Sequence, residues 1–416
     1  MKEEKFRVYG YRWVVLGVFM LINAAIQILW ICFAPITGPA AEYYGVSDMS
    51  IGFLAMVFMF VYIPISMPVS WVIDKLGYYK SVSIGAMIMA FFGLLRGLLS
   101  TDYTWVLVST LGLALAQPFM MNSISTVAAK WFPVKERATV GGLATIASFL
   151  GIAIGEVVSP MLYLRYGINN MLMIYGGIAF VSAVLFVIFT REAPPTPPCT
   201  EGQEIRALMM DGLKDMLKMK DMWILLALFL VGMGIFNGIS TWIEGIVRSR
   251  GFTISQAGNL GGVLLLGGVV GAAIIPVLSD RLHKRKIFLM LGIIFAIPGL
   301  VGVTFANSYN LIVASFFTLG FFLMSLAPVG YQYGAEITFP SPEGTSNGLL
   351  NLAGQLSVVF IFSMEAFRSA NGSFSVSLIT MMVMMAAAAL LVSRLSKSRV
   401  EIQESSLAVE QDRHSV

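Results

Sequence analysis

The chain has 416 residues, of which 57% are hydrophobic and 12% charged, with a formal net charge of +4. Soluble domains carry roughly 25% charged residues, so this composition cannot cover a water-facing surface. The basic residues are spread over short loops with no basic face, so we expect no nucleic-acid partner. Cys32 lies in an apolar segment and Cys199 in a polar linker, so we expect no disulfide. Both histidines lie in polar segments, which leaves almost no material for a metal site, and we expect no cofactor.

Apolar segments of about 20 residues recur along the whole chain, and each can cross about 30 Å of hydrocarbon as a helix. Lipid offers the backbone no hydrogen bonds, so spanning segments satisfy their own as helices. The sequence therefore predicts an all-α membrane protein with twelve transmembrane helices. They lie at residues 12–40, 48–73, 79–99, 104–131, 138–163, 168–190, 223–247, 255–279, 287–306, 310–335, 345–367 and 373–394.

The longest polar break, 192–222, divides these segments six and six. It begins with a proline-rich stretch that must be extended, and apolar residues recur at helical spacing over 203–220. We interpret this break as a cytoplasmic linker with an interfacial helix, the alternative being a flexible linker. The division predicts an N-terminal six-helix bundle at 1–191, a C-terminal six-helix bundle at 223–395 and a cytoplasmic tail at 396–416.

Lys and Arg are distributed unequally across the membrane. If both termini lie on one side, 22 of the 27 basic residues fall on that side and four on the other, with Arg96 near the end of the third segment. Loops rich in Lys and Arg stay in the cytoplasm. We therefore expect cytoplasmic N- and C-termini, and a monomeric, multi-pass protein of the plasma membrane.

The two halves carry a similar loop after their second segment. Residues 71–80 read WVIDKLGYYK, and residues 277–286 read VLSDRLHKRK. This parallel repeat is typical of two bundles related by an axis along the membrane normal. An aspartate at a helix end can pair with bases and neighbouring helix ends, so we predict that these residues gate the bundles. They are Asp74 with Lys75, and Asp280 with Arg281.

Polar groups inside the segments are candidates for contact with a cargo, because each is costly in lipid. Counted at 1.5 Å per residue, three amides fall near the midplane, where such proteins bind cargo: Gln117, Asn237 and Gln355. Gln117 precedes Pro118, so its alternative role is to cap a kink.

Aromatic residues accompany these amides. Trp30 lies somewhat toward the outer side of the first segment, with Gln27 one turn below it, and Phe236 is beside Asn237. The alternative for Trp30 is a place in the interfacial aromatic belt.

Few ionisable residues lie within the segments. Glu156 lies well inside the fifth, and no Lys or Arg in mid-segment compensates it. An uncompensated carboxylate with aromatic walls suits a cation or a proton, so we predict that Glu156 couples a proton or balances a cationic cargo, with structural pairing as the alternative. We interpret Glu244 as an ordinary outer-end residue.

Two motifs resemble those of known proteins. The loop repeat resembles the signature of the major facilitator superfamily, G-x-x-x-D-R-x-G-R-[KR], with Ser70 and Lys75 replacing its first glycine and arginine. Residues 336–351 read EITFPSPEGTSNGLLN and resemble the loop between spans 10 and 11 of the feline leukaemia virus subgroup C receptor (FLVCR) family. Shorter matches lie at residues 11–16, 57–68 with Trp71, 116–117 leading to 131–133, and 239–241.

The resemblance implies the major facilitator fold and a carrier linked to choline, ethanolamine or haem. It implies a site around the first-helix tryptophan, matched by Trp30, and two glutamines, matched by Gln117 and Gln355. Asn237 stands where the family has a seventh-helix aromatic residue, and Glu156 where an apolar residue is usual. Both departures suit an amine that needs a charge partner better than they suit choline.

The sequence thus predicts an alternating-access transporter of a small organic solute, an amine or organic cation. The alternative is a proton-coupled carrier or efflux pump of a neutral or amphipathic compound, and the third possibility is a non-transporting membrane receptor. We predict that the chain is not an enzyme, because it lacks a nucleophile with a nearby base, a metal cluster and a phosphate loop.

Overall fold

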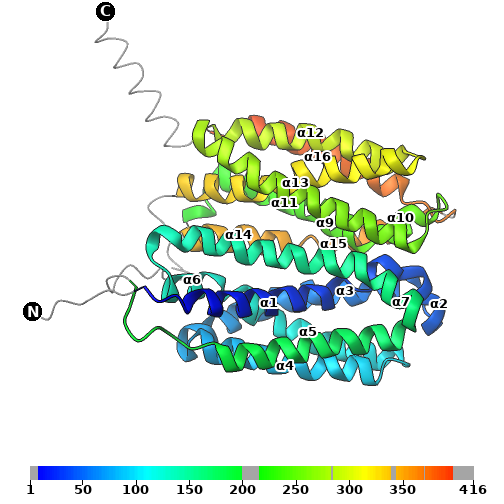
Figure 1. Cartoon of the computed structure of the whole chain (residues 1–416). Coiled ribbons are helices and arrows are strands. Elements are labelled where there is room, and N and C mark those ends of the chain that lie inside the picture. Colours follow the sequence, from blue (N-terminus) through cyan, green and yellow to red (C-terminus); the bar gives the residue numbers. More distant parts are fainter. Residues whose placement is uncertain (1–7, 199–214, 283, 339–342, 370, 397–416) are drawn as a thin grey trace, which may run out of the picture. The chain divides into compact units, whose positions relative to one another are not determined.

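The computed structural model describes residues 8–198, 215–282, 284–338, 343–369 and 371–396, and within them every regular element is a helix (Figure 1). Most of the predicted interfacial helix at 203–220 and all but the first residue of the predicted tail at 396–416 lie outside the described residues. The chain forms two compact units, Met1–Ile205 with Ser240–Gly262, and Arg206–Ile239 with Val263–Val416. The boundaries predicted for the two bundles remain a prediction.

The helices follow the predicted apolar segments, several of them as two shorter helices. The first unit holds α1 (Arg12–Ile31), η1 (Ala34–Ile36), α2 (Thr37–Tyr44), α3 (Asp48–Leu76), α4 (Tyr78–Leu98), α5 (Tyr103–Met121), α6 (Ile124–Trp131), η2 (Val134–Glu136), α7 (Arg137–Phe189) and α10 (Ile243–Arg248). Helices α9 (Lys220–Thr241) and α11 (Ile254–Leu282) contribute residues to both units. The second unit also holds α12 (Arg285–Phe305), α13 (Tyr309–Thr338), α14 (Glu343–Gln355), α15 (Val358–Ala366) and α16 (Ser375–Ser393).

Eleven helical stretches in the described residues are long and apolar enough to cross a membrane. One of them, Thr139–Phe189, has 51 residues and contains Gly167, whose φ of +76° is not helical. The chain folds back there, since the hydroxyls of Ser159 and Tyr175 lie 2.8 Å apart, and the two parts of α7 run in opposite directions (Figure 1). This stretch supplies two crossings, so the predicted twelve spans and the all-α membrane fold are confirmed.

Small residues let the helices of the first unit approach one another closely. Helix α7 lies along both α1 and α4. A Cβ on Gly93 of α4 would come within 3.1 Å of the Ala179 Cβ, and one on Gly155 of α7 within 3.4 Å of the Ile28 Cα. Without a hydrophobic driving force between helices in lipid, such backbone proximity supplies the van der Waals contact that holds them together.

Four of the spans are interrupted. Helix α1 ends at Ile31, just before Pro35, which has no N–H to continue it. The fourth span breaks between α5 and α6 after Pro118, the seventh between α9 and α10 at Trp242, and the eleventh between α14 and α15. Broken helices expose backbone groups within the membrane only where protein or a cavity surrounds them, and they are the usual location of transporter sites.

Candidate functional site

Trp30 and Gln27 lie on one face of α1, just before its end. They are seven and four residues beyond Asn23, a spacing that places all three side chains in one row. Trp30 is buried, and its indole Nε1 donates a hydrogen bond to the Ala55 carbonyl of α3 at 3.2 Å. This burial and bond differ from what a lipid-exposed belt residue would have.

Gln117 and Gln27 are brought together although 90 residues separate them in sequence. The Gln117 Nε2 donates to the Gln27 Oε1 at 3.2 Å, and both side chains are buried. Each amide has a donor and an acceptor, so one hydrogen bond leaves the pair a further carbonyl oxygen and a further amino group. Those two groups have no protein partner among the described residues and are not fully closed off. They are available to a ligand.

The candidates of the second unit gather where the eleventh span breaks. Asn237 of α9 donates through Nδ2 to the Ser357 hydroxyl at 2.9 Å, and Gln355 is the last residue of α14. Asn237 and Phe236 are buried, whereas Gln355 is half-buried and makes no hydrogen bond within the described part of the chain. This break therefore presents one amide held by the protein and one that is free.

Glu156 is fully buried in α7 without a polar partner. Neither carboxyl oxygen has a hydrogen-bond partner among the described residues. The side chain lies against Gly261 of α11, where an added Cβ would come within 2.8 Å of the Glu156 Cδ. Nothing in the described chain pairs with it, and it makes no hydrogen bond to Trp30 or Gln117.

Arg96 is a buried cation that was not among the site residues predicted from the sequence. Only 1% of it is exposed, and its guanidinium reaches the end of α1. Nη1 donates to the Leu29 carbonyl at 3.0 Å, Nη2 lies 3.6 Å from the Cys32 Sγ, and the group lies 5.8 Å from the centre of the Phe33 ring. Within the described residues it has no carboxylate partner. A lone charge between apolar residues at positions 84–99 is the signal that could have identified it.

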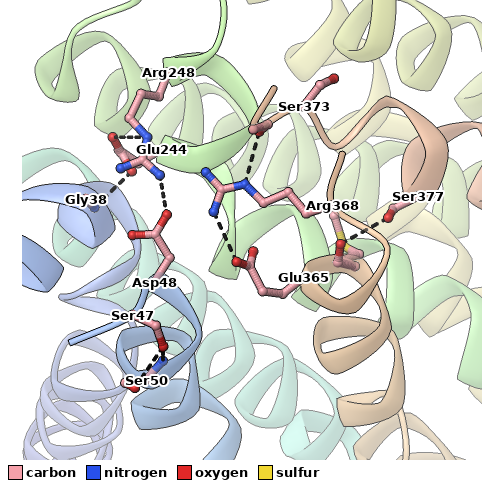
Figure 2. A network of polar contacts seen from close by, with 12 residues as sticks. Gly38, Ser47, Asp48, Ser50, Glu244, Arg248, Glu365, Arg368, Ser373 and Ser377 are labelled. Carbon is pink, nitrogen blue, oxygen red and sulfur yellow. Dashed lines mark hydrogen bonds and ion pairs between the residues drawn. The ribbon is translucent and has the colours of Figure 1, made fainter. Parts of the chain in front are cut away.

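Glu244 belongs to an ion-pair network rather than to an ordinary helix end (Figure 2). Its Oε2 accepts the Gly38 N–H at 3.1 Å, and its Oε1 lies 3.5 Å from the Arg248 Nε. Arg248 also pairs with Asp48, at the start of α3. An added Cβ on Gly38 would overlap the Arg248 guanidinium, so a larger residue at this position would have to displace that side chain.

The four residues predicted to gate the bundles differ between the two loops. Asp74 and Lys75 are exposed; Lys75 lies 4.0 Å from the centre of the Trp71 ring, and Asp74 has no ion pair or hydrogen bond within the described residues. Asp280 pairs with Arg285 rather than with Arg281, which is exposed.

Arg285 extends the second loop's ion pair to a neighbouring helix. It is buried and donates through Nε to Glu336 of α13 at 3.0 Å. In the first loop, Tyr79 occupies the position equivalent to Arg285, and its N–H donates at 2.8 Å to Glu192, which also pairs with Lys130. The gating role of these residues remains a prediction.

The chain is similar to a known family of membrane proteins along most of its length. The chain matches the family described as Major Facilitator Superfamily over residues 13–362 and 243–411. It is 30% identical over 371 residues to solute carrier family 49 member A3 of Xenopus tropicalis, covering 85% of this chain and 77% of that protein. The choline/ethanolamine transporter FLVCR2 of Homo sapiens is 29% identical, covering 85% and 71%. The resemblance to the FLVCR family is confirmed.

A solved structure supports the same fold. The chain matches a bacterial homologue of the human lysosomal transporter Spinster with a TM-score of 0.75 and 17% identity, covering 93% of this chain and 97% of that one. At this identity the likeness shows the fold alone.

Proposed function

The chain belongs to the major facilitator superfamily, and on that premise we propose that this membrane transporter is an alternating-access carrier of a small amine or other organic cation. The supporting observation is the group formed by Trp30, Gln27 and Gln117, buried at the ends of two broken helices. Relatives named as choline/ethanolamine transporters support the same class of cargo.

The chemistry of this group suits a cationic cargo with a polar head. The face of an indole attracts an ammonium by about 0.5 kcal/mol when exposed and 2 or more when desolvated. The Trp30 N–H is already bonded to Ala55, so the ring offers its face rather than its donor. The remaining amide donor and acceptor of the Gln27–Gln117 pair suit a hydroxyl or amine group.

We extend the proposal to Asn237, Phe236 and Gln355 as cargo contacts of the second unit. The free amide of Gln355 and the broken helix beside it support this assignment. Substitution of Gln355 by Leu should weaken cargo binding without reducing thermal stability, because no hydrogen bond within the described protein is lost. An unchanged affinity would remove Gln355 from the site.

A second candidate is a proton-coupled carrier of a neutral or amphipathic compound. It is favoured by Glu156, a buried carboxyl group without a partner among the described residues. An unpaired carboxylate in such surroundings is costly, and either a proton or a cationic cargo would relieve that cost. Glu156 is therefore our proposed coupling residue or counter-charge, and the pH dependence of transport distinguishes the two carriers.

For location, we propose the plasma membrane with both termini cytoplasmic, and a monomer. The unequal distribution of Lys and Arg supports the orientation. A single cysteine introduced at Asp102 or Arg165 should react with an impermeant reagent in intact cells, and one at Asp280 should not. Labelling at position 280, without labelling at positions 102 and 165, would show that the orientation is opposite to the one proposed.

The direct test begins with a thermal-shift screen of the purified protein against amines, vitamins, organic anions and haem. Selective binding raises the melting temperature by mass action. We expect stabilisation by choline, ethanolamine or a related amine, followed by saturable uptake of that compound into proteoliposomes. Stabilisation by neutral or anionic compounds alone would refute the organic-cation proposal.

A further inference from the structure

We propose that Arg96 is a positioning residue for the cargo site: it holds the last turn of α1, and with it the indole of Trp30, in place from the neighbouring α4. This inference rests on the proposed function for its link to cargo, but its structural part is testable without any cargo.

The end of α1 leaves a backbone carbonyl that the helix itself does not satisfy. The Cys32 N–H still bonds to the Ile28 carbonyl, but the chain then turns toward Pro35. The last carbonyls of a helix need partners from elsewhere. The Leu29 carbonyl accepts from the Arg96 Nη1 at 3.0 Å and lies 3.6 Å from the Cys32 Sγ.

The same helix end explains why a cation is buried here without a carboxylate. The carbonyl end of a helix carries about half a negative charge, so a guanidinium is favourable there. The sulfur of Cys32 and the ring of Phe33 also lie beside the Arg96 guanidinium. Its contacts at Leu29, Cys32 and Phe33 lie on both sides of Trp30 in the sequence.

Helix α4 packs closely against α7, so it can serve as a support. Gly97, next to Arg96, lies so close to α7 that an added Cβ would come within 2.7 Å of the Met173 Cα. A guanidinium has a planar, rigid arrangement of donors and loses little freedom for each bond formed. Trp30 is therefore fixed from two directions, by the bond from its own Nε1 to Ala55 and by Arg96 acting on the backbone around it.

The cargo-free test uses fluorine NMR on protein labelled with 5-fluorotryptophan. The chain has seven tryptophans, and substitution of Trp30 by Phe identifies the Trp30 line. Arg96→Met should shift or broaden that line and leave those of the exposed Trp105 and Trp223 in place. Arg96→Lys keeps the positive charge but loses the planar set of guanidinium donors, so it should give a smaller shift of the same line. This variant replaces Arg96→Met in the test if the Met variant does not fold. An unmoved Trp30 line in a folded Arg96 variant would overturn the proposal.

The cargo test is a double-mutant cycle with radiolabelled choline and ethanolamine as probes. A positioning residue acts through Trp30, so its effect should disappear when the indole is absent. We expect Arg96→Met to weaken binding about tenfold in the wild-type background and less than about twofold in the Trp30→Leu background, since small misplacements of a binding group are expensive. Equal losses in both backgrounds would mean a general structural role and would refute the proposal.

The matched control is Arg165→Met, which removes an exposed arginine that stacks on Tyr166. It should change neither the Trp30 line nor binding. If neither probe binds the wild-type protein, the proposed cargo class fails, while the fluorine spectrum still decides whether Arg96 positions Trp30.

Discussion

Arg96 and Glu156 are both ionisable and both buried in the first unit, yet their surroundings are opposite. Arg96 reaches the end of a broken helix and hydrogen-bonds to a free carbonyl, whereas Glu156 lies against the intact face of α11. Inside a helix the N–H groups are already bonded, so that face offers no donor to a carboxylate. The end of α1 thus supplies an acceptor to the buried Arg96, whereas the face of α11 supplies no donor to the buried Glu156. The first residue is suited to positioning and the second to exchanging a proton or meeting a cationic cargo.

The largest expected effect is on stability at Arg96. Arg96→Met removes a charged hydrogen bond worth roughly 1.5–3 kcal/mol and leaves the Leu29 carbonyl with only the Cys32 thiol. We expect a clear drop in melting temperature, measured by differential scanning fluorimetry in detergent. A melting temperature equal to that of the wild type would contradict the view that this cation is satisfied by the protein.

Glu156→Gln should behave in the opposite way. It removes a potential charge that has no partner in the described residues, so stability should stay within about 1 kcal/mol of the wild type or rise. Transport should lose its pH dependence, or cation binding should weaken selectively. Glu42→Gln, at an exposed carboxylate, is the control and should leave both properties unchanged. A destabilised Gln variant with a normal pH profile would assign Glu156 to structure.

The smallest effects are expected at Asp74 and Asp280 in the two related loops, because ion pairs of exposed side chains contribute little to stability. Asp280 pairs with the buried Arg285 and Asp74 has no described partner, so Asp280→Asn should cost up to about 1 kcal/mol and Asp74→Asn almost nothing. Transport rate and cysteine accessibility should follow the same order. A larger effect at Asp74 would point to a partner that this conformation does not contain.

Most of the fold could be predicted from the sequence, because lipid imposes a minimum length of apolar helix on every span. The turn at Gly167 and the gap between Phe305 and Tyr309 agree with the predicted limits of those spans. Depth counting also selected Gln117, and Gln27 was named as the residue one turn below Trp30. Their hydrogen bond depends on the packing of α1 against α5, which the sequence pattern does not contain.

Arg96 was missed for a geometric reason. Its Cα lies near the end of α4, but side chains on a helix point back toward its N-terminus, which here is toward the membrane interior. Glu244 was interpreted as an ordinary end residue because Gly38, whose N–H it accepts, and Asp48, which pairs with the same Arg248, are about 200 residues away in sequence. The helix break at Trp242, just before Glu244, contains no proline from which it could have been predicted.

The central claim, that the buried aromatic group binds an organic cation, is tested most directly by the dissociation constant of one identified amine across Trp30, Trp30→Phe and Trp30→Leu. Phe keeps a weaker aromatic face, and Leu keeps apolar area without the quadrupole. We predict that affinity falls in the order Trp, Phe, Leu, with the Leu variant at least about tenfold weaker than the wild type, where 1.4 kcal/mol is a factor of ten. Equal affinities in the Phe and Leu variants would contradict the claim.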